Sequence, residues 1–71
     1  MFTQAKVKHV WKYRLTKATV INYDDVDGFE KSAACVENLN PQIGDIIEVF
    51  TDEHIHYRGF SAVALKHLNT T

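Results

Sequence analysis

Alternation of apolar and basic side chains in KVKHVWKYRL, Lys6 to Leu15, constrains the fold more than any other feature of this chain. The odd positions carry Val7, His9, Trp11, Tyr13 and Leu15. The even positions carry Lys6, Lys8, Lys12 and Arg14, with Val10 among them. A period of two predicts an extended strand from Ala5 to Leu15 whose odd face packs on the core and whose even face points outward.

The size of the chain limits how much core it can build. Its 71 residues predict a single domain, residues 1–71, with a small margin of stability. One cysteine, Cys35, excludes an intrachain disulfide, so stability must come from packing or from self-association.

Further extended segments follow the first. Lys17 to Tyr23 is rich in β-branched and aromatic residues, and Ile46 to Phe50 is apolar on both faces, as expected of a central strand. Ile55 to Arg58 resumes an extended pattern before Gly59. Phe60 to Leu68 fits either a strand or a short helix, and the strand is favoured.

One helix is expected between these strands. Asp27 followed by Glu30 has the spacing of a capping box, and the apolar stripe behind it is Phe29, Ala33, Val36 and Leu39. The predicted order is therefore β-β-α-β-β. That order predicts an α+β domain, with one helix packed on a curved antiparallel sheet or on a partly closed small barrel.

The basic row of the first strand is the predicted partner-binding site. Its members are Lys6, Lys8, Val10, Lys12 and Arg14. Four cations in a row could meet an acidic protein surface or phosphates, although a solvated edge strand has the same pattern. No aromatic residue shares the row, which disfavours binding of a nucleic-acid single strand. Trp11 and Tyr13, on the other face, are possible interface aromatics.

Chemistry-bearing residues elsewhere give weaker signals. Asp24, Asp25 and Asp27 lack the remaining ligands of a calcium loop, and they are better explained by the start of a helix. His54 and His56 would point the same way on a strand, but two histidines alone favour a structural role over a metal site. Cys35 is expected to be a buried, inert thiol. We therefore predict no cofactor, no metal and no catalytic site.

These observations predict a small non-enzymatic interaction or regulatory protein. Its most plausible partner is a protein with an acidic surface. The alternatives are a nucleic-acid-binding module that uses the same basic face and an oligomeric binder of a small anionic ligand. A homodimer is also compatible with the apolar odd face. In size and style the chain is similar to small accessory or inhibitor proteins of bacteriophages.

The expected location is the cytoplasm, without a membrane partner. The amino-terminal stretch lacks the apolar region of an export signal, and the longest apolar run, Ala62 to Leu65, is too short to span a bilayer. The unpaired cysteine also suits a reducing compartment.

Overall fold

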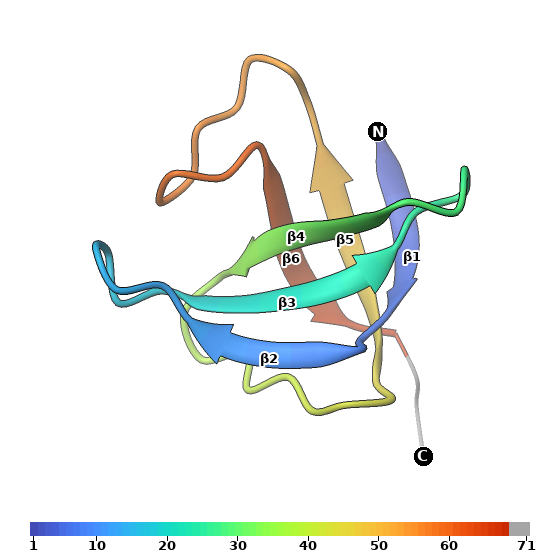
Figure 1. Cartoon of the computed structure of the whole chain (residues 1–71), viewed down its shortest axis with the longest axis horizontal. Helices are drawn as coiled ribbons and strands as arrows, with labels where there is room; N and C mark the ends of the chain where they lie inside the picture. The colour runs from blue at the N-terminus through green and yellow to red at the C-terminus, as the bar shows by residue number, and fades with distance from the viewer. Residues whose placement is uncertain (69–71) are drawn as a thin grey trace.

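The computed structural model describes residues 1–68 and shows an all-β architecture, a curled sheet of six strands (Figure 1). The strands are β1 (Phe2–Lys6), β2 (His9–Lys12), β3 (Thr19–Asp24), β4 (Glu30–Cys35), β5 (Ile46–Thr51) and β6 (Ala62–His67). Their order in the sheet is β1-β5-β6-β4-β3-β2, and every neighbouring pair is antiparallel except β4 and β6.

The two outermost strands of the sheet, β1 and β2, are halves of one bent strand. Val7 N donates to Asp45 O at 2.9 Å beside β5, and Lys8 N donates to Asn22 O at 2.7 Å on β3. Between these two bonds the chain passes from one neighbouring strand to the other. The bend therefore connects the two edge strands of the sheet, which curls into a partly open barrel (Figure 1).

Counting β1 and β2 as a single strand gives a familiar connectivity. The five strands are then the bent β1–β2 strand, β3, β4, β5 and β6. The bent strand, β3 and β4 form a meander, β4 runs parallel to β6, and β5 returns to pair with the β1 half of the bent strand. This is the order of the five-stranded Greek-key barrel called the OB-fold. Two long loops, the β2–β3 loop (residues 13–18) and the β5–β6 loop (residues 52–61), lie on the same side of the barrel in Figure 1.

The barrel encloses a compact core. Its largest fully buried side chains are Tyr23, Ile21, Ile47, Val7 and Val49. A smaller apolar group, buried but outside the main cluster, consists of Ala18, Val20, Ala34 and Val63. Val20 lies directly opposite Trp11 on β2 and Ala34 on β4, so these three side chains share the outer face of the sheet.

The predicted helix is absent, and with it the α+β class: this segment forms β4 instead. Gly28 at φ +84° and the hydrogen bond from Asp25 N to Phe29 O at 2.8 Å make a tight β3–β4 turn. Asp27 accepts from Phe29 N within that turn, so it does not cap a helix. Ala33, Ala34 and Cys35 are all buried, so both faces of this strand are apolar. A strand that is apolar on both faces can also match the apolar spacing of a helix, which explains the mistaken prediction.

The first strand was predicted with the wrong faces beyond residue 7. Val7, at an odd position, is buried. Val10, at an even position, lies opposite the core residue Ile21, so beyond the bend the even positions face the core and the odd positions face outward. Trp11 and His9 therefore occupy the outer face and are exposed, whereas the core face was expected for both. The corner of the barrel causes the reversal, because the strand changes neighbours there.

Three of the four remaining strand predictions are confirmed. β3 and β5 confirm the extended segments Lys17 to Tyr23 and Ile46 to Phe50, and β6 confirms the strand interpretation of the last segment. Ile55 to Arg58 is not a strand. It belongs to the β5–β6 loop, where only an isolated bridge joins Tyr57 and Phe60.

Candidate functional site

Three aromatic rings from distant parts of the chain meet where the two long loops approach each other. We call Trp11, Tyr13 and Phe60 the aromatic cluster. Ring centroids lie 6.3 Å apart for Trp11 and Tyr13, 6.2 Å for Trp11 and Phe60, and 5.2 Å for Tyr13 and Phe60, all edge to face. Such contacts hold rings at fixed angles and stabilise by about 1 kcal/mol each beyond area burial.

Glycine and a loop-to-loop hydrogen bond bring the cluster together. Gly59 has φ +90°, and a Cβ added there would lie 3.5 Å from Cε2 of Tyr13. The positive φ, more than lack of space, favours glycine at this position. Thr16 Oγ1 donates to Arg58 O at 3.5 Å and links the β2–β3 loop to the β5–β6 loop.

A shallow groove runs beside the aromatic cluster. Its lining is one continuous segment, Trp11, Lys12, Tyr13, Arg14 and Leu15. Trp11 is 39% exposed and Leu15 is 81% exposed. Rings and an aliphatic side chain are thus accessible beside two cations, a combination suited to a ligand with both flat apolar surfaces and negative charge.

The cations near the groove differ in their partners. Lys12, Arg14 and Lys17 make no ion pair with any other residue of the 1–68 segment. Arg58, by contrast, donates to Glu37 Oε1 at 3.1 Å and lies 5.3 Å from the ring centroid of Tyr57. Three of the four cations are therefore available to an incoming anion.

The structure divides the predicted basic row. Lys12 and Arg14 lie at the groove with Trp11 and Tyr13. Lys6 ends β1 opposite Ile46 on β5, and Val10 is 38% exposed on β2. Neither of these two residues lines the groove.

Lys8 lies elsewhere and is already paired. Its Nζ is 3.0 Å from Glu30 Oε1 and 3.2 Å from Asp24 Oδ1. The hydrogen bonds that it donates to Glu30 first, and then to Asp24, raise the pKa of the Lys8 ammonium. An anionic partner would have to compete with two carboxylates for this side chain.

A polar network on the outer face of β3 and β4 fixes Trp11 from one side. The indole Nε1–H of Trp11 donates to Asn22 Oδ1 at 2.8 Å, and Ser32 Oγ donates to the same oxygen at 3.0 Å. Asn22 Nδ2 in turn donates to Glu30 Oε2 at 3.0 Å. The hydrogen bonds from Lys8 first, and then from Asn22, lower the pKa of the Glu30 carboxyl.

Phe60, Asn22, Ser32 and Glu30 had not been predicted as site residues. Asn22 is a polar residue between the apolar residues Ile21 and Tyr23 of β3, and this is the signal in the sequence that could have indicated a specific hydrogen bond. Phe60 gives no such signal, because its proximity to Tyr13 depends on the complete barrel.

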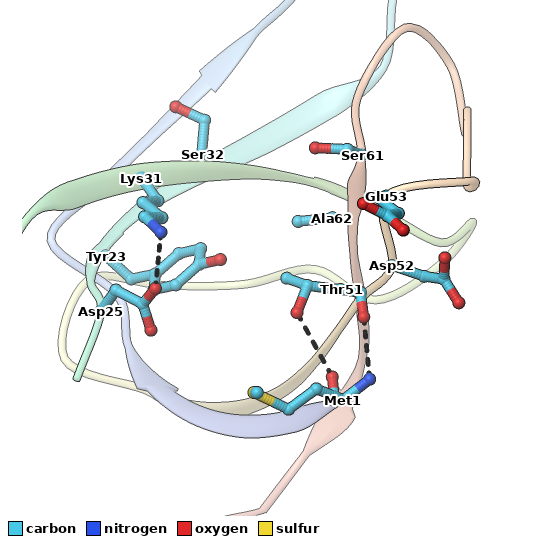
Figure 2. Close-up of a pocket in the computed structure, with 10 residues that line it drawn as sticks. All are labelled: Met1, Tyr23, Asp25, Lys31, Ser32, Thr51, Asp52, Glu53, Ser61 and Ala62. Atoms are coloured by element: carbon cyan, nitrogen blue, oxygen red, sulfur yellow. Dashed lines mark hydrogen bonds and ion pairs between the residues drawn. The ribbon is translucent and has the colours of Figure 1, made fainter. Parts of the chain in front are cut away.

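A second hollow, of about 600 Å³, opens at one end of the barrel (Figure 2). Lys31 Nζ lies 2.7 Å from Asp25 Oδ2 on one side, and the ring of Tyr23 forms part of the wall. Burial first, and then the charge of Asp25, raise the pKa of the Tyr23 phenol. The charged lining is mixed, with Asp52 and Glu53 across from the Lys31–Asp25 pair, so it selects no single class of ligand.

Residues considered as metal ligands are scattered. His54 and His56 are exposed in the β5–β6 loop, and no group of three or more potential metal ligands occurs within residues 1–68. Asp25 serves the β3–β4 turn, where its Oδ1 accepts from Val26 N at 2.8 Å. Cys35 is buried, and burial raises the pKa of its thiol to about 11.

Comparison of the chain with protein families, with characterised proteins and with solved structures found no match. Over the described residues there is no helix that could span a membrane.

Proposed function

We propose that the protein binds single-stranded nucleic acid at the groove beside the aromatic cluster. The observation that carries the proposal is one groove lined both by the rings of Trp11 and Tyr13, which Phe60 supports from the β5–β6 loop, and by the unpaired cations Lys12 and Arg14. Unstacked bases pack on aromatic faces, and phosphates between them are neutralised by lysine and arginine.

The fold supports this proposal by analogy. OB-type barrels bind oligonucleotides on the face of their second and third strands and with the loops that here correspond to residues 13–18 and 52–61. The aromatic cluster lies where those two loops meet. A shared fold does not by itself imply a shared function, so the rings and the cations carry the argument.

Charge is distributed unevenly along the sheet. The basic β2–β3 loop precedes β3, and the acidic β3–β4 turn, with Asp25 and Asp27, follows it, so the two lie at opposite ends of that strand (Figure 1). A net charge of -1 is therefore compatible with a local anion-binding surface. The acidic turn would repel phosphates and confine a bound strand to the basic end.

A titration of labelled single-stranded and duplex oligonucleotides at low salt tests the proposal. Because stacking contributes about 1–3 kcal/mol per base, Trp11→Ala should weaken single-strand binding by roughly 5-fold to 150-fold. Phe29→Ala is the matched control, since Phe29 is 68% exposed on the distant β3–β4 turn. Absence of single-strand binding at low salt, or equal loss in both variants, would refute the proposal.

A protein partner with an acidic surface is the second candidate. It is favoured by the position of β2 at the edge of the sheet, where an extended partner segment could pair with it, and by exposed Leu15. Val10→Ser should then abolish partner capture while leaving oligonucleotide binding nearly unchanged, because Val10 is exposed on β2 and does not line the groove. In either case we place the protein in the cytoplasm, as the single unpaired Cys35 supports.

A further inference from the structure

Trp11 is the single tryptophan of the chain, and its indole is held by a chain of hydrogen bonds. The chain runs from Trp11 to Asn22, from Asn22 to Glu30, and from Glu30 to Lys8, with contacts of 2.8, 3.0 and 3.0 Å. Its residues come from β2, the adjoining bend, β3 and β4. The orientation of one exposed ring is thus linked to three strands of the barrel.

The network admits only one orientation of the Asn22 amide. Its Oδ1 accepts from both Trp11 and Ser32, while its Nδ2 donates to Glu30. Turning the amide over would place its NH₂ group against the indole N–H, which can only donate, and its oxygen against a carboxylate. Glu30 therefore determines which way Asn22 points, and Asn22 determines where the indole N–H points.

Glu30 is itself well anchored. Its Oε1 accepts from Lys8 at 3.0 Å, and its Oε2 accepts from Asn22. Hydrogen bonds to an ionised carboxylate are shorter and stronger than those between neutral groups. Glu30 is thus the charged centre on which the orientation of both neighbours depends.

We infer that Asn22 and Glu30 are positioning residues that hold the Trp11 indole as a fixed stacking ring for a nucleic-acid single strand. This inference rests on the proposed function. A ring already oriented before binding loses less conformational entropy when a base stacks on it, so its orientation contributes directly to affinity.

The same network defines the class of single strand. Indole has one N–H donor and no acceptor, and the donor of Trp11 is already bound to Asn22. The ring can therefore offer its face to a base but no hydrogen bond to the base edge. Stacking of this kind tolerates every base, so the site accepts single strands largely irrespective of sequence.

Two substitutions of Glu30 separate positioning from general stability. Glu30→Ala removes the acceptor for Asn22 Nδ2. Glu30→Gln keeps a carbonyl oxygen there and should preserve most of the positioning of Asn22 and Trp11. Glu48→Ala, on the central strand β5, is the matched control. In the free protein, NMR measures exchange of the Trp11 indole N–H with water, and fluorescence anisotropy decay measures ring motion.

Glu30→Ala should speed indole N–H exchange, increase ring motion and weaken binding of a dT oligonucleotide by roughly 3-fold to 10-fold, the loss expected for one hydrogen bond. Glu30→Gln and Glu48→Ala should resemble the unmodified protein in all three measurements. Unchanged indole exchange and ring motion in Glu30→Ala would overturn the positioning role. Failure of the unmodified protein to bind any oligonucleotide would instead overturn the proposed function.

Homopolymers test the class of ligand. Oligonucleotides of about 12 nucleotides composed of dT, dC or dA should bind with affinities within roughly tenfold of one another, a spread attributable to stacking strength. Selection of one base by more than a hundredfold would overturn the inferred tolerance, because such selection requires hydrogen bonds to a base edge.

Discussion

Replacement of Lys12 by glutamine should weaken the salt dependence of single-strand binding, whereas replacement of Lys8 should leave it unchanged, although both residues belong to the basic row of the first strand. Lys12 lines the groove and has no ion-pair partner within residues 1–68. Lys8 is bound by Glu30 and Asp24. Only the first of these ammonium groups is available to release a counterion from a phosphate.

The magnitude follows from the number of available cations. For a single strand, the logarithm of the binding constant falls with the logarithm of salt concentration with a slope near -0.7 for each neutralised phosphate. Lys12 and Arg14, the two cations that line the groove, together predict a slope of about -1.4. A fourfold increase in salt should therefore reduce affinity by roughly 7-fold.

Fluorescence anisotropy of a labelled dT oligonucleotide, titrated at several salt concentrations, gives this slope for each variant. Lys12→Gln should reduce its size by about 0.7, and Lys8→Gln should leave it unchanged within error. Thermal melts of both variants control for folding. Equal reductions of the slope in the two variants would show that ion pairing in the structure does not decide which lysines meet phosphate, and the reasoning would fail.

Three further predictions concern reactivity and stability. Cys35, whose thiol pKa burial raises to about 11, should react with Ellman's reagent at pH 8 only after unfolding, and fast reaction of the native protein would contradict its placement. The lowered pKa of Glu30 means that its stabilising contribution is present at neutral pH and is lost as pH falls below about 4. Urea unfolding between pH 3 and pH 7 should show the free energy of unfolding decline toward low pH, and Glu30→Gln should make that decline smaller. Ile47→Ala in β5, at a fully buried position, should lower the free energy of unfolding by about 2–5 kcal/mol in the same assay, and a loss below 1 kcal/mol would place Ile47 outside a packed core.

Local patterns in the sequence predicted most of the strands but misassigned two segments, the one that forms β4 and Ile55 to Arg58, which lies in a loop. The apolar residues that become β3 and β5 have clear extended signatures, whereas those of β6 also fit a short helix. In the segment around Ala33, burial on both faces of β4 mimics a helical stripe, and the spacing of Asp27 and Glu30 mimics a cap. Gly28, in a left-handed conformation, was the stronger signal, because it permits the tight turn that begins the hairpin.

The candidate site was predictable only in part, for a different reason. Trp11, Tyr13, Lys12 and Arg14 are adjacent in sequence and could be singled out from it. Which of them face the same way depends on the reversal at Val7 and Lys8, a bend with no glycine or proline to indicate it. Contacts between residues far apart in the chain, such as those of Phe60, follow from barrel closure and not from local sequence.

The bent first strand also sets an order of events during synthesis on the ribosome. β2, β3 and β4 are consecutive and can pair as soon as residue 35 has emerged, whereas β1 must wait for β5, more than 40 residues later in the chain. Non-local pairings of this kind form late and slowly. Phe60 emerges later still, so a nascent chain presents Trp11 and Tyr13 without the third ring of the cluster. The surface proposed to bind nucleic acid therefore lacks the Phe60 ring until the β5–β6 loop has emerged.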